Sequence, residues 1–233
     1  MLKRVLIVLA ILLGLAAMAD RFMAGAAGDA AGGQVRRAVK TPADASVKFR
    51  GFPFVTQALR GRFQHIDVVA RDVPVQGLTL DRVDARFTGV RVKLGDALAG
   101  DLQAVPTDKA AATARLTFDN LNSYLRRRGS LTVAPAGDQV VVTGQVRVNG
   151  ALIAGKGNAR VVVRPGSLVL QVTSASANGI GIPAAAARLL TVTVPTAGLP
   201  FGMVLQSVAV TADALVLRGT AEGIVIPTAK VTR

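Results

Sequence analysis

The chain of 233 residues lacks cysteine and tryptophan, and it has one histidine and one glutamate. Without cysteine it has no disulfide framework, no thiolate metal site and no cysteine nucleophile. The single histidine, His65, excludes a metal site built from several imidazoles. With Glu222 as the only glutamate, almost every acid is an aspartate. We therefore expect no metal, no cofactor and little scope for acid–base catalysis.

What the chain does contain is positive charge together with many apolar residues. Lysine and arginine number 28 against 14 acids, a net charge of +14, yet 51% of the residues are hydrophobic. A basic disordered tail is excluded, because such tails are poor in apolar residues. Eight phenylalanines and one tyrosine offer few stacking platforms for bases, which argues against nucleic acid as a partner. An anionic membrane surface is the better partner for this charge.

The first residues have the three-part pattern of a secretory signal peptide. Met1–Arg4 is basic, Val5–Ala19 is an uninterrupted apolar run, and Ala17-Met18-Ala19 is a small-residue cleavage pattern. As a helix, the apolar run would be about 22 Å long, which is short of a hydrocarbon core of about 30 Å. The alternative is an uncleaved anchor, because Phe22 and Met23 prolong the apolar stretch. Both alternatives export the rest of the chain to the periplasmic side of the plasma membrane or the cell envelope.

Residues 20–45 form a bridge with two interpretations. Apolar residues recur there every four positions, as on one face of a helix. These are Phe22, Ala26 and Ala30, and also Met23, Ala27 and Ala31. Four glycines weaken such a helix, each by up to about 1 kcal/mol relative to alanine. The bridge is therefore either a membrane-proximal helix or a flexible linker, and Thr41-Pro42 ends it.

Residues 46–233 are predicted to form one β-rich domain. Apolar and polar side chains alternate in the runs Leu78–Leu94, Val140–Val148, Leu168–Val172 and Val208–Val216. In the first run the alternation slips by one residue twice, as a β-bulge would cause. Turns such as Asn149-Gly150 and Pro165-Gly166 separate the runs. This pattern predicts an α+β fold with a long, strongly curved antiparallel sheet.

Three short helices are predicted between the strands, at Pro53–Arg60, Asp119–Arg128 and Pro183–Leu190. The first has proline in its opening turn and Gly61 just past its end, which is the usual asymmetry of helix termini. In the second, Phe118, Leu121 and Leu125 follow helical spacing, and Gly129 ends the helix.

Candidate catalytic groups are few, and each has a simpler structural interpretation. His65 and Asp67 lie two residues apart on a predicted strand and so share a face, but no nucleophile motif accompanies them. Paired-carboxylate hydrolysis would need two aspartates, such as Asp81 with Asp84 or Asp67 with Asp72. We interpret these as polar positions of strands and turns, and we predict that the chain has no catalytic residue.

Three segments of the chain have the character of family motifs. They are Gly51–Phe63 with the strand Ile66–Val73 after it, Leu116–Leu125, and Leu199–Val208. In this order they resemble the opening motif, the central helix motif and the C-terminal signature of the LmeA-like phospholipid-binding family, envelope proteins of bacteria with mycobacterial-type lipoglycans. With the leader and the bridge, the resemblance covers nearly the whole chain.

The resemblance implies a tubular lipid-binding architecture, in which a long curved sheet wraps around short helices and encloses lipid in a channel. A hydrophobic helix precedes this domain at the N-terminus. The resemblance also implies phospholipid binding or transfer outside the plasma membrane, a link to lipomannan or other lipoglycan maturation, and no catalytic residue. It supplies no single lipid-contacting residue, so the candidate site comes from the pattern of the chain.

We expect apolar residues of the first two helices and of adjoining segments to line a lipid groove. The candidates are Phe52, Phe54, Val55, Leu59, Phe63, Phe118, Leu121, Tyr124, Leu125 and Phe201. Arginines at the mouth of this groove are expected to contact an anionic headgroup or the membrane surface. They are Arg50, Arg60, Arg62, Arg126, Arg127 and Arg128.

Two other interpretations lead to different functions. If the apolar residues only fill a core and the arginines form a solvated basic face, the chain would be an accessory scaffold for a membrane glycosyltransferase, without a lipid groove. If two of the aspartates act together, the chain would be a hydrolase of a lipid-linked sugar, and substituting them would abolish turnover while lipid binding survives.

Overall fold

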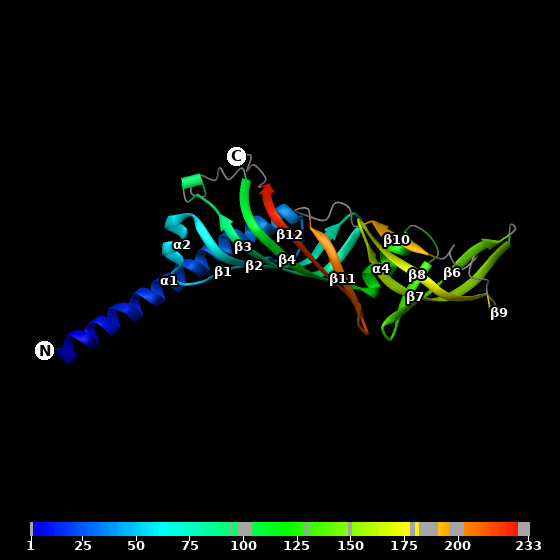
Figure 1. The fold of residues 1–233 in the computed structure, drawn as a ribbon, viewed down its shortest axis with the longest axis horizontal. Coiled ribbons are helices and arrows are strands. Elements are labelled where there is room, and N and C mark those ends of the chain that lie inside the picture. The colour runs from blue at the N-terminus through cyan, green and yellow to red at the C-terminus, as the bar shows by residue number, and fades with distance from the viewer. Residues whose placement is uncertain are drawn as a thin grey trace. The chain divides into compact units, whose positions relative to one another are not determined.

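The computed structural model describes residues 2–93, 95–96, 104–127, 129, 131–148, 151–177, 180–181, 191–195 and 203–227. The helices are α1 (Leu2–Val39), α2 (Phe54–Arg60) and α4 (Phe118–Arg126) (Figure 1). The strands are β1 (Ser46–Arg50), β2 (Arg62–Val75), β3 (Leu78–Arg91), β4 (Ala104–Thr117), β5 (Leu131–Ala136), β6 (Gln139–Val148), β7 (Ala151–Arg164), β8 (Ser167–Ala177), β9 (Ile180–Gly181), β10 (Val192–Pro195), β11 (Val204–Val210) and β12 (Ala214–Pro227). The predicted α+β class is confirmed.

The strands form two large antiparallel sheets. One has the order β1-β2-β3-β4-β12-β11, and the other has the order β10-β8-β7-β6-β5, with β9 paired to β8. Several strands, such as β2 and β7 with 14 residues each, are much longer than the usual five or six residues. Two antiparallel sheets, few helices and a leading apolar helix are consistent with a tubular lipid-binding fold.

By its internal contacts the chain divides into two compact units. Unit 1 comprises Met1–Ala70, Asp84–Ala110 and Glu222–Arg233, and unit 2 comprises Arg71–Val83 and Ala111–Ala221. Unit 1 therefore holds α1, α2 and β1, and unit 2 holds α4 and β5 to β11. The strands β2, β3, β4 and β12 contribute residues to both units.

The first half of α1 projects from unit 1 as an isolated helix (Figure 1). The exposed fractions of its large apolar side chains are 57% for Ile11, 57% for Leu15 and 70% for Met18. Within the described residues, Ala10–Val39 is long and apolar enough to cross a membrane, judged by length and composition alone. Only 6% of its most apolar 18-residue stretch is buried, so this half of α1 is not a helix of the protein core.

The second half of α1 packs closely on β1 through small residues. Ala24, Gly28 and Gly32 are spaced by four residues and are buried. A β-carbon at Gly28 would lie 2.4 Å from the carbonyl oxygen of Val47, and one at Gly32 would lie 2.4 Å from that of Ala45. Real β-carbons do not approach so closely, so glycine lets the helix backbone reach the strand. Glycines that were expected to loosen the bridge thus permit its packing.

The apolar residues that the spacing assigned to one helix face are mostly exposed: Phe22, Met23, Ala26 and Ala30 are exposed, and Ala27 and Ala31 are half-buried. Phe22 is 79% exposed and Met23 is 50% exposed. The helix is continuous from Leu2 to Val39 and therefore runs without a break through the predicted boundary at residue 19.

The predicted elements of unit 1 match the structure at several points. The helix predicted at Pro53–Arg60 is confirmed as α2, and Gly61 ends it in the left-handed region at φ 64°. In β3, Gly89 has φ 66° between the buried Phe87 and Val90, which accounts for one predicted slip of the alternation.

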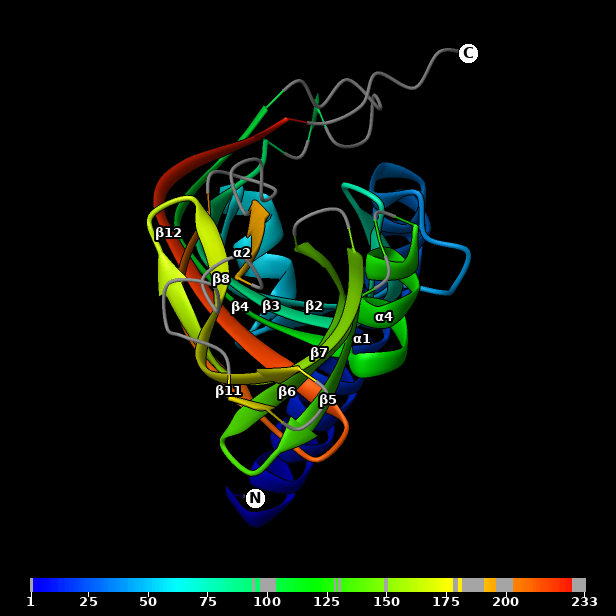
Figure 2. The same ribbon diagram turned by 90° about the vertical axis from the view of Figure 1, so that its right-hand side faces the viewer.

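Unit 2 contains the large side chains that are almost completely buried. They are Leu116, Leu121, Val133, Val140, Val142, Leu170 and Leu215. Helix α4 lies beside β5 (Figure 2). The side-chain amide of Asn122 donates to the carbonyl of Val133 at 2.9 Å and accepts from the Val133 N–H at 2.7 Å. This pair of hydrogen bonds fixes α4 against the strand.

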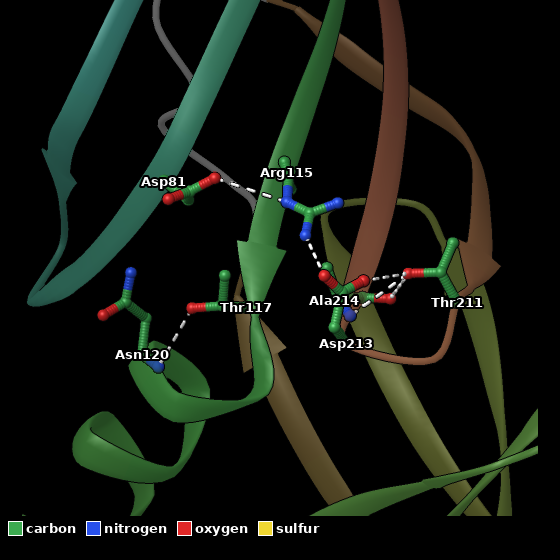
Figure 3. Close-up of polar contacts among 7 residues, drawn as sticks. All are labelled: Asp81, Arg115, Thr117, Asn120, Thr211, Asp213 and Ala214. Atoms are coloured by element: carbon green, nitrogen blue, oxygen red, sulfur yellow. Dashed lines mark hydrogen bonds and ion pairs between the residues drawn. The ribbon is translucent and has the colours of Figure 1, made fainter.

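Helix α4 confirms the second predicted helix, with somewhat different ends. Its N-cap is Thr117, whose Oγ1 accepts the N–H of Asn120 at 3.3 Å (Figure 3). The N–H of Gly129 donates to the carbonyl of Leu125 at 2.9 Å, just beyond the helix. The third predicted helix, Pro183–Leu190, and the predicted turn at Asn149-Gly150 lie outside the described residues.

The alternation through Val208–Val216 predicted one strand, and that prediction is wrong. β11 ends at Val210, β12 begins at Ala214, and the two strands pair antiparallel. Thr211 stabilises the turn between them, because its Oγ1 accepts the N–H of Ala214 at 3.1 Å. The alternation of apolar and polar residues passes through this turn without a change of phase, so the pattern alone does not reveal the reversal.

Candidate functional site

The segment Gly51–Phe63 is held by a carboxylate from a distant part of the chain. Asp20 of α1 is 5% exposed and accepts the N–H groups of Phe54 and Val55, each at 2.9 Å. These groups belong to the first turn of α2, where a helix leaves its own donors unpaired. Pro53, the residue before α2, offers no side-chain cap. Asp20 therefore fastens α2 to α1, and its negative charge complements the positive end of the helix.

Gln57 connects α2 to the two neighbouring strands. Its side chain is buried, its Nε2 lies 3.4 Å from the carbonyl of Arg50, and its Oε1 accepts the N–H of Gln64 at 2.9 Å. A β-carbon at Gly51 would lie 2.9 Å from this Nε2, and Gly51 itself has φ 95°. Glycine is thus required at position 51 both by the backbone and by the space that Gln57 occupies.

Three phenylalanines form an aromatic cluster beneath α2. The ring centroids of Phe49 and Phe54 are 5.3 Å apart, those of Phe49 and Phe63 are 5.0 Å apart, and those of Phe54 and Phe63 are 5.9 Å apart. These distances are typical of favourable aromatic pairs. Phe54 and Phe63 are buried and Phe49 is half-buried. Two of the predicted groove residues therefore contribute to the core of unit 1, together with Phe49, which the sequence did not single out.

The paired strands β1 and β2 have an apolar face on the side of this cluster. Val47 lies opposite Val68, and Phe49 lies opposite Ile66. Directly opposed residues point to the same side of a sheet, and Phe49 contacts Phe54 of α2. This is therefore the face nearest the helix. Phe49, Ile66 and Val68 are only half-buried, so they leave apolar surface that an acyl chain can contact.

The opposite face of these strands is polar and basic. Lys48 lies opposite Asp67, and Arg50 lies opposite His65. The carboxylate of Asp67 accepts from Nε of Arg86 at 2.7 Å and from Nε of Arg50 at 2.8 Å. The hydrogen bonds from Arg86, and then from Arg50, outweigh partial burial and lower the pKa of Asp67. Arg50, His65 and Arg86 line an open depression of about 390 Å³.

This arrangement bears on two expectations from the sequence. Arg50, a predicted headgroup contact, lies on the opposite face of the strands from the aromatic cluster. The carboxylate of Asp67 is held by two arginines, and His65 lies beside them in the depression. Asp67, Arg50 and Arg86 therefore form an ion-pair network on the basic face of the strands.

The other predicted headgroup arginines of unit 1 lie around the end of α2. Arg60 is the last residue of α2 and is exposed. Arg62 begins β2, and its Nη2 lies 3.8 Å from Oδ2 of Asp108. Both guanidinium groups remain accessible to a ligand or to a membrane surface.

The predicted arginines of unit 2 include one with a structural contact. Nη2 of Arg127 donates to the carbonyl of Gly77 and joins the end of α4 to the turn between β2 and β3. Arg126 is exposed, and its Nη2 lies 3.1 Å from Oγ of Ser123. Arg128 lies outside the described residues.

The predicted apolar residues fall into a buried group and an exposed group. Phe118, Leu121, Tyr124 and Leu125 of α4 are all buried, at 7%, 1%, 5% and 5% exposure. Near α2, Val55 is half-buried, whereas Phe52 is 58% and Leu59 is 71% exposed. Phe201 lies outside the described residues. Helix α4 therefore contributes mainly to the core of unit 2, and the outer side of α2 presents apolar groups to its surroundings.

A second ion-pair cluster, in unit 2, includes Asp81, one of the aspartates that were considered for catalysis. Nε of Arg115, in β4, lies 3.3 Å from Oδ2 of Asp81 in β3 (Figure 3). Nη2 of the same arginine donates to the carboxylate of Asp213, in the turn after β11. The hydrogen bond from Arg115, and then that from Thr211, lowers the pKa of Asp213. A carboxylic general acid needs the opposite shift. Within the described residues, this cluster has the geometry of a structural contact between strands.

The sequence analysis missed three features of the region around α2 in unit 1. Asp20 is the only acid among the first 28 residues, and an isolated acid on an apolar helix is a usable signal of a buried partner. Ile66 and Val68 share one face of a predicted strand, which marks them as candidates for apolar contact. The role of Gln57 carries no such signal, because its partners become neighbours only when the chain folds.

Comparison with known proteins found one family whose sequence model covers these elements. The family model described as LmeA-like phospholipid-binding matches residues 18–220. The matched range includes Asp20, the Gly51–Phe63 segment and α4. No curated protein and no solved structure matches the chain. The family match spans most of the sequence, and the chain therefore belongs to the LmeA-like phospholipid-binding family.

Proposed function

We propose that the protein is a non-catalytic phospholipid-binding or lipid-transfer protein of the cell envelope. The family match over residues 18–220 is the observation that carries this proposal. The half-buried apolar face of Phe49, Ile66 and Val68 supports it, because an acyl chain would remove that surface from water. The ion pairs of Asp67 with Arg50 and Arg86, and of Asp81 with Arg115, give two of the candidate carboxylates a structural role, which favours a protein without acid–base catalysis.

The preferred ligand in this proposal is an anionic phospholipid, handled on the outer side of the plasma membrane. The net charge of +14 favours it, and each lysine or arginine near an anionic bilayer contributes about 1 kcal/mol. The apolar α1 is the kind of segment that directs or anchors an exported protein. A contribution to lipomannan or other lipoglycan maturation is the cellular role that the family resemblance suggests.

Lipid uptake by matched variants tests the proposal. The full chain in mild detergent is mixed with vesicles of phosphatidylglycerol or phosphatidylcholine that contain a fluorescent phospholipid, and the protein is then separated and its bound lipid measured. We expect uptake from phosphatidylglycerol, and we expect Ile66→Gln to lower it several-fold. His65→Gln is the matched control, because neighbouring residues of a strand point to opposite faces. A folded parent chain that takes up no lipid from either vesicle would refute the proposal.

The scaffold alternative is favoured by one observation, the near-complete burial of Leu121, Tyr124 and Leu125 in α4. A filled interior of this kind suits a sheet with a purely structural role. The same experiment separates the two functions. A scaffold for a membrane glycosyltransferase would carry no lipid, and Ile66→Gln and His65→Gln would then behave alike.

A further inference from the structure

We propose that α1 is retained as a membrane-spanning helix and that the outer side of α2, with the turn before it, docks on the lipid bilayer where α1 emerges. The surface consists of Phe22, Phe52 and Leu59 with Arg21 and Arg60, all in unit 1. It determines how the protein meets the membrane and does not depend on whether the protein carries a lipid.

The free part of α1 is apolar and flanked by basic residues at both ends, as in a short membrane span. The apolar run Val5–Ala19 makes about 22 Å of helix. A hydrocarbon core of about 30 Å adapts to such a span by thinning locally, while long basic side chains at the ends of the span reach the headgroups. The basic residues at the ends of this run are Lys3, Arg4 and Arg21. The described side chains between Ala10 and Ala19 are exposed except for the half-buried Ala17. In water this would be an unpartnered apolar helix, whereas in lipid every one of these side chains has a suitable environment.

Asp20 marks the point where α1 joins the folded part of the chain. It is the first buried side chain of α1 from Ala10 onward, and its carboxylate caps α2. Cleavage after Ala19 would make Asp20 the first residue. The new ammonium group would then stand beside the positive end of α2, and the helical turn that positions the carboxylate would be lost. The observed contact is therefore one that an intact α1 provides.

The surface around this junction combines exposed apolar groups with arginines. Phe52 is 58% exposed, Leu59 is 71% exposed and Phe22 is 79% exposed. The guanidinium carbon of Arg21 lies 5.7 Å from the centroid of the Phe52 ring. Arg60 is exposed at the end of α2. Aromatic and leucine side chains mixed with arginine are typical of groups that lie at a membrane interface.

Continuity with α1 identifies the bilayer as the occupant of this surface. Arg21 and Phe22 directly follow the junction at Asp20, so they lie at the boundary of any membrane that Val5–Ala19 spans. Phe52 contacts Arg21, and α2 lies at the end of unit 1 from which α1 projects (Figure 1). The two arginines match the negative charge of phospholipid headgroups. One boundary plane can therefore hold the whole surface.

Single tryptophans test the proposal, because the natural chain has none. The full chain is reconstituted into vesicles of phosphatidylcholine and phosphatidylglycerol, with or without bromine on the acyl chains, which quenches nearby tryptophan. Phe52→Trp and Leu59→Trp probe the surface, and both sites are exposed, so the change disturbs no packing. Leu15→Trp reports on the span. Gln34→Trp is the control on the same helix, exposed and about 21 Å beyond Asp20.

The proposal predicts blue-shifted emission at positions 15, 52 and 59, with most of the fluorescence lost in brominated vesicles. Position 34 should emit as in water and keep its intensity. If positions 52 and 59 behave like position 34, the surface does not dock on lipid and the proposal is overturned. An unquenched tryptophan at position 15 would overturn it at the first step, because α1 would then not enter the bilayer.

Discussion

Alanine in place of a glycine of α1 should have opposite effects at positions only three residues apart. At Gly25 no atom lies within 4 Å of the added β-carbon, so alanine should stabilise the helix by about 1 kcal/mol. At Gly28 the same gain applies, but the β-carbon would lie 2.4 Å from the Val47 carbonyl oxygen, whereas ordinary contact begins at 3.4 Å. The helix and strand must separate by about 1 Å, and such overpacking costs about 1–3 kcal/mol.

The two variants should therefore differ in stability by about 1–3 kcal/mol, with Gly28→Ala the less stable. Urea unfolding of the full chain in mild detergent, followed by circular dichroism, measures this difference. Gly32→Ala should behave like Gly28→Ala, because its β-carbon would lie 2.4 Å from the Ala45 carbonyl oxygen. Gly33→Ala is a second control, since it has open space around it. If Gly25→Ala and Gly28→Ala raise the midpoint equally, α1 does not pack on β1 and the account of the bridge is wrong.

Three further predictions concern the core, the ion pairs and the cap of α4. Leu121→Ala should lower the free energy of unfolding by about 2–5 kcal/mol, because the side chain is 1% exposed, whereas Leu59→Ala at 71% exposure should change it by less than about 0.5 kcal/mol in the same urea experiment. Because the pKa of Asp67 is lowered in the folded chain, the contribution of Asp67 to stability is complete above its unfolded pKa and is lost as the pH falls through the lower folded pKa. Between about pH 6 and pH 3 the melting temperature should therefore fall less steeply for Asp67→Asn than for the parent chain. Equal pH dependence of the two melting temperatures would exclude the ion pairs of Asp67 with Arg50 and Arg86. Thr117→Ala should cost about 1 kcal/mol in the same urea experiment because the N–H of Asn120 loses its acceptor, and an unchanged midpoint would show that the cap is not formed.

Local signals were sufficient to predict α2 and α4. Proline and glycine mark both ends of α2, and the spacing of Phe118, Leu121 and Leu125 identifies α4. These signals work because helix ends depend on a few neighbouring residues. The sequence analysis did not identify the cap of α4, which is Thr117, two residues before the predicted start of the helix at Asp119.

Local signals did not reveal the features that depend on contacts between distant parts of the chain. Gly28 and Gly32 weaken an isolated helix, and their benefit exists only against the backbone of β1. The chain reversal after Val210 leaves no mark in the alternation, because the apolar phase is the same on both sides of the turn. In each case the deciding contact joins parts of the chain that a local pattern treats as independent.

The candidate site also combines features that local patterns indicate with features that depend on how the strands pair. The apolar residues near α2 were predicted to act as one group, but Phe54 and Phe63 pack in the core, while Phe52 and Leu59 are exposed. Which residues of an apolar set are covered depends on how the strands pair. The register of β1 with β2 placed Ile66 beside Phe49, and this juxtaposition could only come from the folded chain.

Native mass spectrometry of the whole 233-residue chain, purified in mild detergent, tests the central claim of phospholipid binding most directly. The account predicts ions that carry the added mass of phospholipid, with an anionic lipid identified after release. It also predicts a marked loss of this adduct in Ile66→Gln but not in His65→Gln. Ions of the bare chain alone, even after incubation with anionic vesicles, would contradict it.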